Sequence, residues 1–199
     1  MIPCISQATT MSTSFEGDLD AFSRSGFRHV ELWLTKLEDF VAERSIESAV
    51  EALASRGLTA PAAAAQGGLL LSRGEERASH WAHFQGRLTL LQTLGVGTLV
   101  IIPDFLSEPR GDDLARAMSS LREAGALAQA HGVRLALEFQ KTARFCASLD
   151  TTLAFLAQSE APGVGVCFDL FHYFTGPSKF EDLAYLSLET LAWVQISDL

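Results

Sequence analysis

Short apolar runs of strand length alternate along the whole chain with amphipathic stretches of helical length. The expected strands cover residues 2–7, 29–34, 58–66, 98–105, 133–140, 164–174 and 192–199. The expected helices, in which apolar residues recur every three or four positions, cover residues 15–25, 46–56, 75–94, 113–130, 149–159 and 180–191. Glycines that suit a left-handed turn separate a helix from the next strand at Gly26, Gly57, Gly95, Gly132 and Gly163. This alternation predicts βα units and a parallel sheet.

The expected strands have two unlike faces, which decides between an open doubly wound sheet and a closed barrel. In residues 134–140, Leu135 and Leu137 share one face, whereas Ala136 and Glu138 share the other. A strand between two helical layers is apolar on both faces, but a barrel strand has helices outside and a layered interior and mouth inside. No glycine-rich nucleotide-binding sequence follows the first strand. The pattern therefore predicts an α/β protein with a (β/α) barrel of the TIM type.

The chain holds about seven of the eight βα units that close such a barrel. A complete barrel takes about 250 residues, whereas this chain has 199 and ends at Leu199, on the seventh expected strand. We expect a single domain over residues 1–199 that lacks the final βα unit and is incomplete on its C-terminal side. An open sheet edge invites association with another chain, so a homo-oligomer is one expectation.

Composition limits the partners of this domain. No apolar run reaches the length of about 18 residues that spans a bilayer, and the first residues lack the pattern of a secretory signal. We therefore expect a cytoplasmic protein without a membrane partner. The formal net charge of −9 repels phosphate backbones, which argues against nucleic acid as a partner. The three cysteines are widely spaced and are interpreted as buried thiols.

Three polar residues fall near the carboxyl ends of successive expected strands, on the inferred inner face: Glu138, Asp169 and Gln195. Barrel enzymes carry their active sites at this end. Two neighbouring buried carboxylates repel each other, so a bound cation is one explanation for them. The alternative is structural, with one acid paired to Arg or Lys and another capping a helix.

The sequences around these residues resemble those of a known family. LALE at residues 135–138, VGVCFDLFH at 164–172 and WVQISD at 193–198 are similar to the xylose isomerase-like barrel superfamily, the sugar phosphate isomerase/epimerase group. The resemblance implies one divalent ion held by a Glu on strand five, an Asp on strand six, a His or Gln on strand seven and a Glu on strand eight. Glu138, Asp169 and Gln195 match the first three positions, and the fourth has no counterpart in this chain.

The resemblance also implies a reaction. It predicts an isomerase or epimerase of a sugar, sugar phosphate or polyol that acts through a metal-stabilised enediolate, with Glu138 as the base. Gln195 in place of His resembles the branch of 3-dehydroshikimate dehydratase and inosose enzymes, so a dehydratase is the close alternative. A non-catalytic, truncated barrel is the third. Oxygen ligands favour Mn²⁺ or Mg²⁺, with Zn²⁺ or Co²⁺ as the alternatives.

Four further residues are candidates for contact with a carbohydrate-like substrate. His172 follows Asp169 by three residues and is expected to orient a substrate hydroxyl. Glu31 on the inner face of the second strand is a candidate contact or a structural ion pair, and Trp33 beside it is an apolar wall or core. Lys179 is a candidate for binding phosphate or carboxylate, although a capping box of Ser178 and Glu181 explains its surroundings without a ligand.

Overall fold

The computed structural model describes residues 3–198 and has a single sheet at its centre. Seven parallel strands follow one another in chain order across the sheet. They are β1 (Ile5–Ser6), β2 (His29–Trp33), β3 (Thr59–Gln66), β4 (Thr98–Ile101), β5 (Arg134–Glu138), β6 (Val164–Asp169) and β7 (Leu191–Gln195). Sequential parallel order is the topology of a βα barrel rather than of a doubly wound sheet, whose strand order reverses.

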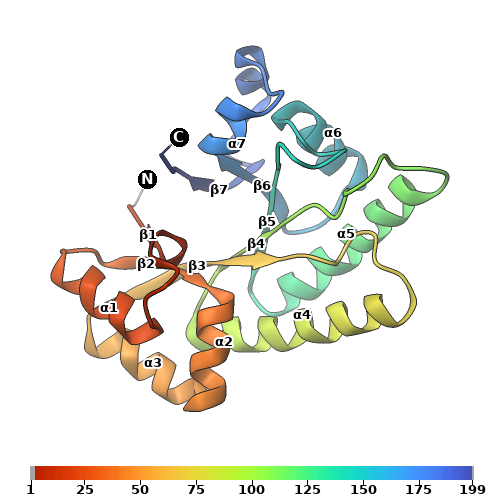
Figure 1. Ribbon diagram of the computed structural model, residues 1–199. Helices are drawn as coiled ribbons and strands as arrows, with labels where there is room; N and C mark the ends of the chain where they lie inside the picture. The colour runs from red at the N-terminus through yellow and green to blue at the C-terminus, as the bar shows by residue number, and fades with distance from the viewer. Residues whose placement is uncertain (1–2, 199) are drawn as a thin grey trace.

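Helices cover the outside of the curled sheet (Figure 1). The α-helices are α1 (Phe15–Arg24), α2 (Leu34–Glu43), α3 (Ile46–Ser55), α4 (Gly74–Leu94), α5 (Asp113–Ala130), α6 (Leu149–Ser159) and α7 (Leu170–Thr175). Two 3₁₀ helices, η1 (Gln7–Thr10) and η2 (Phe180–Tyr185), complete the set. Within the described residues β1 and β7 are the edges of the sheet, so the barrel is incomplete, as expected.

The two faces of the sheet differ as the strand pattern predicts. Leu135 and Leu137 of β5 belong to the large apolar core between the sheet and the outer helices. The inner face carries a small separate cluster that contains Ala136 and Cys167. Small side chains inside and large ones outside let the parallel strands curl around a narrow interior. Within residues 3–198, none of the helices is both long and apolar enough to cross a bilayer.

Several expected boundaries were wrong. Helix α2 was not anticipated, because it follows β2 directly and its N-cap residue, Trp33, provides no side-chain cap. Strand β4 ends at Ile101, two residues before Pro103, which has no N–H to donate to a strand ladder. Residues 170–175 continue β6 as helix α7 rather than as strand.

The C-terminal segment also departs from expectation. Instead of a helix over residues 180–191, η2 ends at Tyr185 and a turn leads into β7. In that turn the side chains and backbones of Ser187 and Thr190 exchange hydrogen bonds of 3.0–3.2 Å, which fixes the entry into β7 at Leu191. Strand β7 itself ends at Gln195. Residues 2 and 199 of the expected outer strands lie outside the described part of the chain.

Candidate functional site

The ends of β5, β6 and β7 bring Glu138, Asp169 and Gln195 together. Each is the last residue of its strand. In the sheet register, Glu138 lies opposite Cys167 and Asp169 lies opposite Gln195. Since the strands are parallel and adjacent, these side chains share the carboxyl-terminal rim of the barrel, where barrel enzymes position their catalytic groups.

Glu138 is a buried carboxylate with no Lys or Arg partner among residues 3–198. Its side chain is 9% exposed, and one oxygen accepts a hydrogen bond of 2.9 Å from Gln140 Nε2. The pKa of Glu138 is raised to about 7, chiefly by burial; the nearby carboxylates of Asp169 and Glu31 add to the rise, and the hydrogen bond from Gln140 opposes it. Within residues 3–198, no Lys or Arg forms an ion pair with any of these three acids. Among residues 3–198, the ion pair with Arg or Lys that the structural alternative expects is therefore absent from these acids.

Asp169 fulfils the other part of the structural alternative, because it caps a helix. Its Oδ1 accepts a hydrogen bond of 2.9 Å from the backbone N–H of His172, at the start of α7. A short helix thus begins at the point where β6 delivers its carboxylate to the rim. The cap engages one oxygen and orients the side chain, which is compatible with a second contact through Oδ2.

Gln195 is held from two sides by protein groups. Its Nε2 donates to the two oxygens of Glu31 at 3.1 and 3.2 Å, and its Oε1 accepts from the Cys167 thiol at 3.4 Å. Glu31 itself, 3% exposed, also accepts from Ser6 Oγ at 2.8 Å and from Trp193 Nε1 at 2.5 Å. Protein donors therefore occupy both oxygens of Glu31, the candidate for contact with substrate. No Lys or Arg among the described residues forms an ion pair with Glu31, which was the structural alternative.

His172 lies beside Glu138, with 3.9 Å between His172 Nε2 and Glu138 Oε1. Burial lowers the pKa of His172, with Lys141 acting in the same direction and Asp169 opposing them. The backbone N–H of Lys141 approaches Nδ1 at 3.4 Å, so Nδ1 is the acceptor and Nε2 carries the proton of the neutral ring. That proton lies on the side of the ring that is nearer to Glu138.

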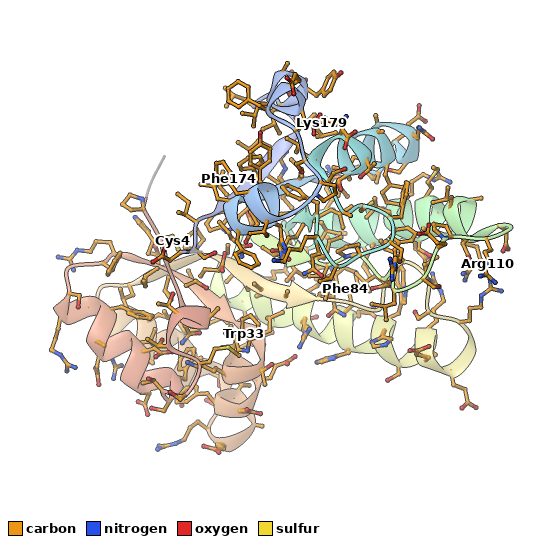
Figure 2. All side chains as sticks on the ribbon, turned by 45° about the horizontal axis from the view of Figure 1, so that its top comes forward. Cys4, Trp33, Phe84, Arg110, Phe174 and Lys179 are labelled. Atoms are coloured by element: carbon orange, nitrogen blue, oxygen red, sulfur yellow. The ribbon has the colours of Figure 1, made fainter. Side chains whose placement is uncertain are left out.

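Trp33 and Lys179 do not join the cluster to the same degree. Trp33 is half-buried at the end of β2, on the same inner face as Glu31, and its backbone N–H donates to Gln7 Oε1 at 3.0 Å. Lys179 is exposed, and Figure 2 shows it well apart from Trp33, in the segment beyond α7. Among the described residues, no hydrogen bond or ion pair connects the Lys179 side chain to Glu138, Asp169 or Gln195.

The expected capping box was wrong in its residues. The backbone N–H of Lys179 donates to Asp182 Oδ2 at 2.7 Å, so Asp182 rather than Glu181 completes the turn. Ser178 instead accepts a hydrogen bond of 3.0 Å from the backbone of Leu149, the first residue of α6. The motif was assigned one residue too early because Glu181 and Asp182 are both acidic.

Trp193 was not identified from the sequence, although its indole N–H donates to Glu31 and so helps to hold the cluster. Trp193 shares a face of β7 with Gln195, and this alternation is the one local signal that could have found it. Within residues 3–198, no three His, Cys, Asp or Glu side chains gather closely enough to hold a metal by themselves. At this rim the strand ends place the carboxylates of Glu138 and Asp169 together with the amide group of Gln195. A hollow of about 300 Å³ lined by Pro3 and residues 25–29 lies at the opposite end of β2.

Known structures share this architecture. The IolI protein with a bound zinc atom superposes with a TM-score of 0.90 at 20% identity, over 100% of this chain and 73% of that one. D-psicose 3-epimerase with D-tagatose, from Clostridium cellulolyticum H10, gives 0.81 at 19% identity, over 100% and 73%. The 3-keto-D-glucoside 4-epimerase YcjR from E. coli gives 0.81 at 17% identity, over 100% and 80%. At these identities the likeness shows the fold.

Sequence comparison identifies the family. Curated proteins give no match to this chain. The family model described as xylose isomerase-like TIM barrel, however, matches residues 19–199, which is most of the sequence. That match agrees with the sequential parallel strands and with the polar rim on β5, β6 and β7. The chain therefore belongs to the xylose isomerase-like TIM barrel family.

Proposed function

We propose that this protein is a divalent-metal-dependent isomerase or epimerase of a sugar or a sugar-like polyol. The observation that supports this most directly is the excess of negative charge at the rim. Glu138, Asp169 and Glu31 lie close enough for their charges to interact, and none has a Lys or Arg partner among residues 3–198. Uncompensated buried carboxylates are costly, and a cation would relieve that cost.

The donor groups fit a hard divalent ion. Glu138 and Asp169 would contribute carboxylate oxygens, and Gln195 would contribute its amide oxygen, which suits Mg²⁺ or Mn²⁺. When bound there, such an ion would polarise a substrate carbonyl and offset the negative charge of an enediolate. Membership of the family and the structural likeness to two sugar epimerases support the same assignment.

The side chains around the rim then have separate tasks. Glu138, at the rim beside the position proposed for the ion, would accept the α-proton of a hydroxy-carbonyl substrate and return it. Return to the neighbouring carbon gives an isomer, and return to the opposite face of the same carbon, by a second acid, gives an epimer. His172, neutral and with its Nε2 3.9 Å from Glu138, would donate to a substrate hydroxyl and orient it.

A dehydratase shares the first step and differs in the second. After the α-proton is removed, departure of a β-hydroxyl group as water gives an unsaturated carbonyl product. Because Gln195 stands where other family members carry His, the dehydratase is included in the test as the alternative. Lys179 remains a candidate for binding an anionic substrate group, although within residues 3–198 no hydrogen bond or ion pair joins its side chain to Glu138, Asp169 or Gln195.

The test has two stages. Isothermal titration of EDTA-treated protein with Mn²⁺ should show binding that Asp169→Asn weakens and that Glu51→Gln, an exposed carboxylate on α3, leaves unchanged. Proton exchange in deuterated water, over ketoses, inososes and 3-dehydroshikimate, should then identify the substrate class, and product analysis should distinguish isomerisation from loss of water. Absence of Mn²⁺ binding would refute the proposal, and binding without exchange over the panel would favour a non-catalytic barrel.

A further inference from the structure

Glu31 connects both edges of the sheet through a single carboxylate. It lies on β2, is 3% exposed, and accepts from Ser6 next to it on β1. From β7, on the far edge, it accepts from Trp193 Nε1 at 2.5 Å and from Gln195 Nε2 at 3.1 and 3.2 Å. Three donors thus make four contacts, which uses the whole acceptor capacity of a carboxylate.

The chemistry of these groups fixes the orientation of the Gln195 amide. A carboxylate only accepts hydrogen bonds, so the end of the amide that faces Glu31 has to be the NH₂ group. The carbonyl oxygen must then point the other way, and there it accepts from the Cys167 thiol at 3.4 Å. Cys167 lies on β6, opposite Glu138 in the register and two residues before Asp169 on the same face.

We propose that Glu31 is a positioning residue that turns the Gln195 amide so that its oxygen faces β6 and the carboxylates of Glu138 and Asp169. The orientation exists without any ligand, but its value for binding rests on the function proposed above. Without Glu31, the NH₂ group and the oxygen of Gln195 would compete for the same place at the rim, and the NH₂ group would repel a cation.

The substitution Glu31→Gln tests this because it keeps the shape and removes half of the acceptors. Ser6 can reverse its hydroxyl and accept from the new NH₂ group, but Trp193 Nε1 only donates. The oxygen of the new amide is therefore expected to face Trp193, and the NH₂ group to face Ser6. The Gln195 amide then faces one acceptor, the oxygen of the new side chain, and one donor, the NH₂ group of that side chain. The Gln195 amide is therefore no longer fixed in one orientation.

Ser6→Ala is the matched control, since it removes a different donor to the same carboxylate and leaves Gln195 fully held. The first measurement is NMR of the metal-free protein. In the wild type, the side-chain NH₂ protons of Gln195 should show a nuclear Overhauser effect to the Trp193 indole N–H, because both donate to one carboxylate. Ser6→Ala should retain this signal, and Glu31→Gln should weaken it.

The second measurement is Mn²⁺ affinity by titration calorimetry. Loss of a residue that orients a ligand typically weakens metal binding about 10- to 100-fold, which is the loss expected for Glu31→Gln. Ser6→Ala should stay within about 3-fold of the wild type. Circular dichroism must show cooperative unfolding for each variant, and Glu31→Asp serves in place of Glu31→Gln should the latter not fold.

The outcomes separate this proposal from the proposed function. If the wild type binds no Mn²⁺, the function fails, and the NMR signal alone decides the orientation of Gln195. Absence of that signal in the wild type overturns the positioning role. So does a wild type that binds Mn²⁺ alongside a folded Glu31→Gln variant of equal affinity.

Discussion

The burial of Glu138 predicts that the metal-free protein loses stability as the pH rises. Its pKa in the folded protein is about 7, above the ordinary value of 4.5, chiefly because of burial. Between these two pH values the folded state binds more protons than the unfolded state, so the free energy of unfolding falls with rising pH. The contribution of Glu138 is fully present below pH 4.5 and is lost as the pH passes through 7.

The size of this effect follows from the separation of the two pKa values. At about 1.4 kcal/mol for each pH unit, the interval from 4.5 to about 7 corresponds to a loss of about 3 kcal/mol by pH 8. Glu138→Gln has nearly the same shape and still offers an oxygen to Gln140, but it cannot ionise. At pH 8 the metal-free variant should therefore be more stable than the wild type by up to about 3 kcal/mol.

Urea denaturation in EDTA, followed by circular dichroism at pH 4.5 and pH 8, measures this difference. The stability advantage of Glu138→Gln should appear at pH 8 and vanish at pH 4.5, and Glu51→Gln should match the wild type at both. Added Mn²⁺ should stabilise the wild type more than the variant, because only the wild type offers the second carboxylate. An equal advantage at both pH values would refute the argument from burial and charge.

Three further predictions concern the rest of the fold. Gly125→Ala would place a Cβ 2.3 Å from the Pro162 backbone oxygen and should destabilise the protein by about 1–3 kcal/mol in urea. Gly86→Ala, at an exposed position of α4 where a Cβ meets nothing within 4 Å, should stabilise it by about 0.5–1 kcal/mol. Lys36→Met would leave Asp18, its partner at 2.6 Å, buried and unpaired, at a cost of about 3–5 kcal/mol that Asp18→Asn should partly restore; an unchanged urea midpoint would contradict this. Burial raises the pKa of every cysteine thiol, so none should react with an aromatic disulfide reagent at pH 8 before denaturant is added.

The barrel and its rim could be predicted because both follow from local pattern. Strand periodicity places alternate residues on opposite faces, and this put Glu138 inside and Leu137 outside without any knowledge of contacts. Helices bounded by glycine were found almost to the residue, as in α5 and α6. The positive φ of all five separating glycines agrees with the turns inferred there.

Two kinds of feature could not be predicted from the sequence. One is contact between residues that are far apart in the chain, and the other is a change from strand to helix that no turn residue marks. Helix α2 follows β2 with no glycine, proline or polar cap between them, so periodicity alone did not separate the two. The hydrogen bonds of Glu31 to Trp193 and Gln195 span 162 and 164 positions, and no local pattern encodes a partner so far away. Sequence therefore located the rim residues but not the carboxylate that orients one of them.

The bonds between β2 and β7 also set an order for assembly of the chain. Synthesis proceeds from the N-terminus, and domains with many distant contacts fold more slowly than those with local ones. Glu31 and its donor Ser6 emerge early, but the bonds that Trp193 and Gln195 donate to the two oxygens of Glu31 form only once β7 has been made and has reached β2. Strand β7 thus reaches the inner face of the sheet after β1 to β6, and the candidate site takes shape at that same moment.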